Sequence, residues 1–130
     1  MRLWHQNLIS KLPRQQLLGQ HRECCALRGK GWGRSHSVVN YVFQYEPECL
    51  VAYHYLVMNE MVARGYQLNQ VWYNKNYRGT TLGYTPGYCK DSLLQYYLSQ
   101  GEQNNLIYPE HNEEYFQECI DNLKSKGIEI

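Results

Sequence analysis

The stretch PRQQLLGQHRECCALRG, residues 13–29, has the spacing of an amphipathic helix. Its least polar positions recur at i, i+1, i+4, i+7 and i+8, so they share one face of a helix. This stripe consists of Leu17, Leu18, His21, Cys24 and Cys25, and Arg28 ends it. No β-branched residue occurs before Gly29, and Pro13 suits the first position of a helix. We therefore expect a helix over residues 13–28. Glu23 points away from the stripe and is expected at or near the surface.

Working outward, two later segments carry the same helical period. The first should begin at Pro47 and stop at Gly65. The second covers residues 112–127, where Asn112 is the expected N-cap and two glutamates occupy the first turn. Both segments have an apolar stripe typical of a helix that packs on a core.

A shorter helix is expected over residues 90–101, with Asp91 or Ser92 as its N-cap. Residues 72–88, rich in glycine and tyrosine, should form a long loop. The expected fold is therefore mainly α, a small irregular helical bundle. At 130 residues the chain is expected to be a single domain, residues 1–130.

Two absences concern membranes and export. No apolar run approaches 18 residues, so no membrane-spanning helix is predicted. Residues 1–14 lack the apolar core of a signal peptide. We therefore predict a cytoplasmic protein.

The five cysteines are odd in number and show no CxxC spacing. His21 and Cys25, four residues apart, are the sharpest candidate for half of a zinc site. No second pair of ligands is evident in the sequence, and reduced buried cysteines are common. We therefore expect no metal and no cofactor.

Charge is distributed unevenly along the chain. Residues 1–36 contain seven lysines or arginines and one acidic residue, Glu23, a formal balance of +6. From residue 37 onward, six basic residues face eleven acidic ones, a balance of −5. This asymmetry favours a face for a polyanion, and a basic solvated surface without a partner is the alternative.

Two segments then indicate a family. NLISKLPRQQLLGQHRE (residues 7–23) and YHYLVMNEMVARGY (residues 53–66) resemble the pyrimidine-dimer DNA glycosylases of the phage endonuclease V type. A looser likeness continues around NYRG, residues 76–79. The resemblance implies the mainly helical fold of that family and damaged double-stranded DNA as the partner. We expect a monomer that binds no membrane.

The resemblance also implies a mechanism. Enzymes of this family cleave the glycosidic bond with their own N-terminal amine, helped by a glutamate on the first helix, and arginines hold the DNA backbone. By position, the glutamate is Glu23 and the arginine beside it is Arg22. The bulky Arg2 should prevent removal of Met1, so the amine would be that of Met1, and Arg2 would match the arginine after the nucleophile. This alignment needs one extra residue between Leu3 and Leu8.

Five basic residues are the predicted DNA contacts. They are Arg2, Arg14, Arg22, Arg28 and Lys30. The chain also departs from the phage pattern. Gln16 replaces a histidine, Ala26 replaces an arginine for which Arg28 would compensate, and the chain ends in KSKGIEI rather than a tyrosine-rich tail.

The proposed chemistry also follows from pKa values. An α-amine ionises near 7.7–8.0 and a lysine near 10.4, so at neutral pH the α-amine is free more often by about two to three orders of magnitude. A carboxylate stabilises positive charge that develops on the sugar, and it can later remove the C2′ proton for β-elimination. These steps define a DNA glycosylase with AP-lyase activity.

Two other functions remain open at this stage. A nucleic-acid-binding module of the same fold would keep the arginines without needing Glu23. A helical interaction protein would carry its basic segment only as a solvated face.

Overall fold

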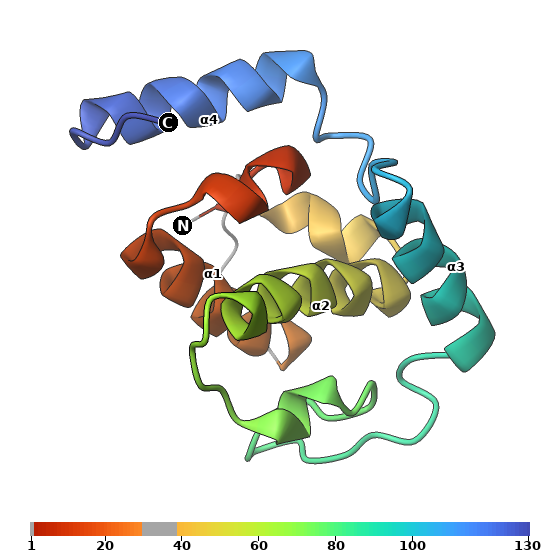
Figure 1. The fold of residues 1–130 in the computed structure, drawn as a ribbon. Coiled ribbons are helices and arrows are strands. Elements are labelled where there is room, and N and C mark those ends of the chain that lie inside the picture. The colour runs from red at the N-terminus through yellow and green to blue at the C-terminus, as the bar shows by residue number, and fades with distance from the viewer. Residues whose placement is uncertain (1, 30–38) are drawn as a thin grey trace.

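A computed structural model describes residues 2–29 and 39–130, and within these ranges the protein is built from helices and loops (Figure 1). Four α-helices are present: α1 (Arg14–Arg28), α2 (Pro47–Ala63), α3 (Asp91–Glu102) and α4 (Glu113–Ser125). Three short 3-10 helices are also present in the described residues: η1 (Gln6–Lys11) before α1, η2 (Asn40–Gln44) before α2 and η3 (Gln70–Tyr73) before α3. The mainly α expectation is confirmed.

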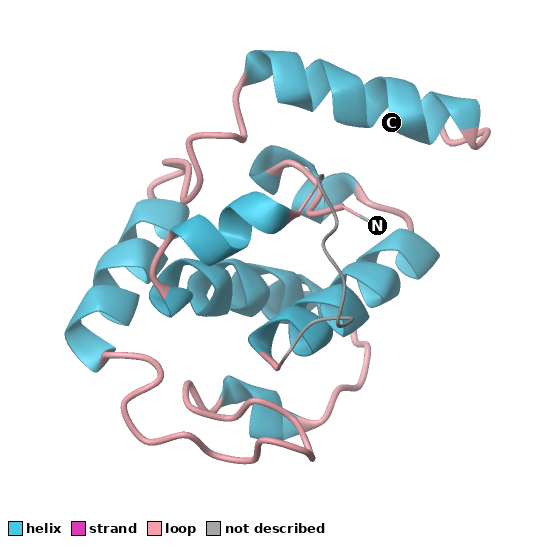
Figure 2. Ribbon diagram, turned by 180° about the vertical axis from the view of Figure 1, so that it is seen from behind, coloured by secondary structure: helices cyan, strands magenta, loops and turns pink. Residues whose placement is uncertain are grey.

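Helix α2 is the centre of the structure. It packs against α1, α3, η1 and η2, and the other elements surround it in both views (Figures 1 and 2). Its side chains are buried on nearly every face, with Val51, Tyr53, His54 and Val57 fully enclosed. A helix that is buried all round loses the one-sided pattern of a surface helix.

The helix ends follow local sequence chemistry, with small corrections. Pro13 is the N-cap of α1 rather than its first residue, and Lys90 caps α3, so the predicted cap at Asp91 or Ser92 was wrong by one or two positions. Asn112 caps α4 as predicted, and its side chain accepts a hydrogen bond from the Tyr115 amide at 2.8 Å. Gly65 follows α2 with φ of 81°, a conformation that favours glycine.

Residues 72–88 are mostly loop, as expected. Here, η3 and an isolated antiparallel bridge between Tyr77 and Tyr84 give local order that the sequence did not indicate. Helix α1 ends at Arg28 as predicted, with Gly29 as its C-cap, and residues 30–38 lie outside the described residues.

Contacts far apart in sequence hold α4 over the start of the chain. The Gln6 side chain accepts from the Ile107 amide at 2.8 Å and donates to the Asn105 carbonyl at 2.9 Å. The Gln6 amide donates to His111 Nδ1 at 3.0 Å, and the Tyr115 hydroxyl donates to the Leu3 carbonyl. These bonds hold α4 next to the N-terminal segment (Figure 1).

Among the described residues, none of the helices is both long enough and apolar enough to cross a membrane.

Candidate active site on the first helix

A cavity of about 370 Å³ lies between α1, the N-terminal segment and α4. One wall is a face of α1 with residues at i, i+3, i+4 and i+7: Gln16, Gly19, Gln20 and Glu23. The other walls are Arg2 and Trp4 from the N-terminal segment and Asn122 and Lys126 from α4 and its end. Residues from both ends of the chain therefore enclose the predicted catalytic glutamate.

Glu23 is more enclosed than expected. Glu23 was expected at or near the surface, and because it is only 5% exposed it does not lie on the surface itself but in a recess below it. Glu23 does point away from the apolar stripe of α1, but Trp4 and α4 cover the face on which it lies. A carboxylate in such a recess attracts a nearby positive charge more strongly than a carboxylate in bulk water does, because less solvent screens the interaction.

Gln20 fixes the start of the chain beside Glu23. Its Oε1 accepts from the Trp4 amide at 2.6 Å, and its Nε2 donates to the Arg2 carbonyl at 3.1 Å. The buried Tyr53 hydroxyl donates to the Trp4 carbonyl at 2.6 Å. Both Gln20 and Tyr53 are buried, so residues 2–4 are tied to α1 and α2 by bonds that water does not replace.

Two cations flank Trp4 at the cavity. The guanidinium of Arg2 lies 5.7 Å from the Trp4 ring centroid, and Lys126 Nζ lies 5.3 Å from it. Arg2 also pairs with Glu118 at 3.6 Å. Burial lowers the pKa of Arg2, but the acidic groups of Tyr115, Cys119 and Glu118 outweigh this and raise it above its ordinary value. The cavity thus combines Glu23 with fixed positive charge.

Arg22 and Arg14 are exposed, as a contact with DNA would require. Arg22 Nη2 lies 3.7 Å from the position that a Cβ would take at Gly19, so the guanidinium sits beside a residue of the cavity wall. The Arg14 guanidinium lies 4.9 Å from the Tyr66 ring centroid, further from the cavity. Arg22 is therefore the α1 cation best placed at the rim.

Arg28 is not a surface cation, and its prediction as a DNA contact was wrong. The residue is fully buried. Its guanidinium donates to the carbonyls of Trp72, Asn74 and Tyr77 at 2.8–2.9 Å. The physical reason is its position, because residue 28 continues the apolar stripe of α1 and faces α2 and the loop that follows it.

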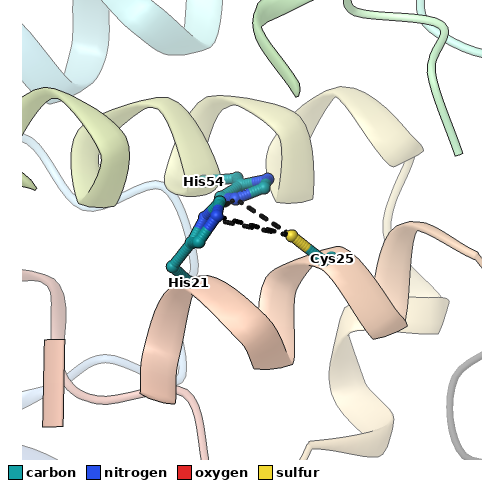
Figure 3. A group of neighbouring side chains, drawn as sticks. All are labelled: His21, Cys25 and His54. Atoms are coloured by element: carbon teal, nitrogen blue, oxygen red, sulfur yellow. Dashed lines mark hydrogen bonds between the residues drawn. The ribbon is translucent and has the colours of Figure 1, made fainter. Parts of the chain in front are cut away.

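The predicted half-site of His21 and Cys25 gains a third member from α2. Figure 3 shows His54 pointing at both residues, and His21 Nδ1 lies 2.8 Å from His54 Nε2. Cys25 Sγ lies 3.8–3.9 Å from the ring nitrogens of both histidines. The sequence could not indicate this meeting, because it depends on how α1 packs against α2.

Arg28 determines whether this cluster of His21, Cys25 and His54 can bind a metal. Its Nη1 lies 3.0 Å from His54 Nδ1, and an arginine can only donate. Burial, with Arg28 and His21 as further causes, lowers the pKa of His54 well below its ordinary value, so the ring is neutral and carries its proton on Nε2. That proton is donated to His21. A metal would need the same nitrogen as a free lone pair, so the cluster is a hydrogen-bonded chain rather than a ligand set.

The other two members of the cluster are also held neutral. Burial, helped by Arg22 and Arg28, lowers the pKa of His21, and burial raises the pKa of the Cys25 thiol to about 12. A neutral thiol is a poor metal ligand and a poor nucleophile.

Two predicted site residues, Met1 and Lys30, lie outside the described residues. Six residues of the cavity wall were not among the predicted site residues: Trp4, Gln16, Gly19, Gln20, Asn122 and Lys126. Gln20 had a readable signal, since it lies three positions before Glu23 on the same helix face. Asn122 and Lys126 had none, because only tertiary packing brings α4 to α1.

The model of the family described as pyrimidine dimer DNA glycosylase matches residues 1–74. The chain belongs to this family. The matched part of the chain contains α1, α2 and η3, whereas α3 and α4 follow it. The α4 wall of the cavity therefore comes from a part of the chain beyond the family match. Comparisons with curated proteins and with solved structures gave no match.

Proposed function

We propose that this protein is a DNA glycosylase with AP-lyase activity, which removes a damaged pyrimidine through an imine between the sugar and the Met1 amine. One observation carries the proposal. Glu23 lies in a cavity whose opposite wall includes Arg2, the residue that directly follows Met1. A nucleophile at the start of the chain and a carboxylate on α1 would then act on the same sugar.

Glu23 has two roles in this proposal. As the base leaves, positive charge develops on the sugar, and the Glu23 carboxylate stabilises it. Once the imine has formed, the C2′ proton is acidic, and Glu23 removes it so that β-elimination breaks the strand. The recess around Glu23 limits solvent screening and supports both roles.

The DNA backbone would be held by the cations around the cavity. Arg2, Arg22 and Arg14 remain the proposed contacts, and Lys126 joins them because it lines the cavity and is exposed. Arg28 takes no part, since it is buried. The cyclobutane pyrimidine dimer is the proposed lesion, and it rests on the family alone.

The test is borohydride trapping on duplex DNA that contains an abasic site. Protein with a free Met1 amine should give a covalent protein–DNA adduct, because borohydride reduces the imine. Protein with an N-terminal tag or an acetylated N-terminus should bind the DNA but give no adduct. No adduct with the free protein would favour a binding module without chemistry.

Mass spectrometry of the digested adduct then locates the nucleophile. The sugar should be found on the Met1 peptide. Lys126 is the internal control, because its amine lines the same cavity. An adduct on Lys126, Lys11 or Lys30 would retain the imine chemistry but exclude the Met1 amine.

A further inference from the structure

Gly19 is the one residue of the α1 wall of the cavity that has no side chain, and it lies in the interior of the helix. A glycine inside a helix destabilises it relative to alanine, because glycine loses more backbone freedom on folding. In the α-helices of the described ranges, only one other glycine occurs, Gly101 of α3. Each of these two glycines therefore needs a reason in the packing or in the function.

Packing within the protein explains Gly101 but not Gly19. A Cβ at Gly101 would lie 3.3 Å from both methyl carbons of Leu56, which is tighter than an ordinary contact. At Gly19, apart from the chain neighbours and the helix backbone, the only described atom within 4 Å of such a Cβ is Arg22 Nη2, at 3.7 Å. That distance is an ordinary van der Waals contact, so an alanine would fit without moving Arg22. The described residues thus leave room for a side chain at Gly19, and the chain does not use it.

The space beside Gly19 is bordered by two side chains of opposite charge. Glu23 lies four positions after Gly19 on the same face of α1, and a helical side chain leans back over the preceding turn. Glu23 therefore leans toward Gly19, and the Arg22 guanidinium borders the same space. A nucleotide of DNA carries a phosphate anion next to its sugar. Arg22 can bind that phosphate, while Glu23 stabilises the positive charge that the sugar develops.

We propose that the deoxyribose of the reacting nucleotide packs directly against the backbone of α1 at Gly19, so that C1′ and C2′ reach the Glu23 carboxylate. The inference deepens the proposed function and rests on it. Glu23 is only 5% exposed, so the sugar has to enter the cavity to reach it. Gly19 is half-buried and open to contact, and it is where no side chain of α1 keeps the sugar away. Gly19 is thus a substrate contact that is retained at a cost in helix stability.

The experiment compares Gly19→Ala and Gly19→Leu with the unaltered protein. Gly19→Ala should raise the urea concentration at which the protein unfolds, because alanine favours the helix. Each variant should also hold the sugar further from Glu23. We therefore expect borohydride trapping on abasic duplex DNA to slow by about ten-fold with alanine and by about 10²-fold or more with leucine, since a displacement of about 1 Å can cost that much. Greater stability with slower chemistry is a combination that a merely structural glycine would not give.

Two controls accompany these variants. Gly101→Ala adds the same methyl group to the other helix glycine, away from the cavity, and should trap within a few-fold of the unaltered protein. The salt dependence of binding to undamaged duplex should be unchanged in Gly19→Ala, because Arg22 stays in place.

Three results would overturn the inference. The first is trapping by Gly19→Ala and Gly19→Leu as fast as by the unaltered protein. The second is lower stability of Gly19→Ala, which would mean that the fold itself requires the glycine. The third is a weaker salt dependence of Gly19→Ala, which would mean that the added methyl group acts by displacing Arg22.

An unreactive site tests the contact without the imine. DNA with a tetrahydrofuran in place of the abasic sugar has no leaving group at C1′, but its ring can still pack against Gly19. The unaltered protein should bind this DNA more tightly than undamaged duplex, and Gly19→Leu should lose most of that preference. If the unaltered protein forms no adduct but shows this preference, and Gly19→Leu loses it, the proposed function fails and the contact at Gly19 stands. If it forms an adduct and both variants trap equally fast, the contact fails and the proposed function stands.

Discussion

Helix α1 carries two polar clusters on different faces, and they differ in how their hydrogen bonds are used. On one face, Arg28 donates to three carbonyls and lies against His54, which in turn bonds His21. On the other face, Glu23 lines a cavity of about 370 Å³ together with Arg2, Trp4 and Asn122. Most polar groups of the first cluster are bonded within the protein, although Arg28 Nε has no hydrogen-bond partner among the described residues, and the second cluster lines a cavity that is open to a ligand.

This difference separates two uses of the same residue types. Buried polar groups that satisfy one another rigidify a structure, and removing one leaves its partners unpaired. Polar groups around a cavity are retained at a cost in stability because they bind or react. Arg22 and Arg28, six positions apart on one helix, provide the sharpest contrast, since one is exposed and the other fully buried.

The largest expected effect is on the chemistry at Glu23. Glu23→Gln keeps the shape of the side chain but removes its charge, so base release should fall by roughly 10²-fold or more, while binding to damaged DNA persists. Single-turnover cleavage and gel-shift titration measure the two effects. Glu114→Gln is the control, because it removes a carboxylate that is exposed on α4 and does not line the cavity. Cleavage by Glu23→Gln within a few-fold of the unaltered protein would remove Glu23 from the mechanism.

The next effect concerns the contribution of the Arg28 cluster to stability. Arg28→Ala leaves three carbonyls and His54 without their donor and opens a space in the core, so unfolding should become easier by about 3–5 kcal/mol. Arg22→Ala should change the same free energy by less than about 0.5 kcal/mol. Urea denaturation followed by circular dichroism measures both. Equal stability of the two variants would contradict the contrast between them.

A smaller effect is expected on DNA binding. Each neutralised phosphate contributes about 0.9 to the slope of log affinity against log salt. Arg22→Ala should reduce this slope by about that amount on damaged and undamaged duplexes alike. Lys124→Ala is the control, since Lys124 is exposed on α4 but does not line the cavity. An unchanged slope for Arg22→Ala would mean that Arg22 faces solvent and contacts no phosphate in the complex.

The last prediction is that the cluster of His21, Cys25 and His54 does not bind a metal ion. If Arg28 fixes the proton of His54 on Nε2, then cobalt(II) added to the protein should produce no thiolate charge-transfer band. Nitrogen NMR should also show His54 Nδ1 without a proton. A band that disappears in Cys25→Ser but persists in Cys24→Ser would instead identify a metal site, and would show that Arg28 releases His54.

Local sequence chemistry determined the main helices. Helix α1 could be predicted from its apolar spacing, and α4 from Asn112 and the spacing after it, because these signals act within a few residues. The sequence also indicated Glu23 as the candidate carboxylate and Arg22 as an exposed cation. The order of helices and the family follow from the same local patterns.

Tertiary structure alone decided which side chains share a site. Arg28 looked like one more basic residue, but the packing of α1 on α2 buried it and gave it carbonyl partners from residues 72–77. Asn122 became a wall of the Glu23 cavity only because α4 folds back over the N-terminal segment. Such contacts join residues that are 44 to 105 positions apart. No local propensity records them, since spacing along a chain describes only neighbours on one element.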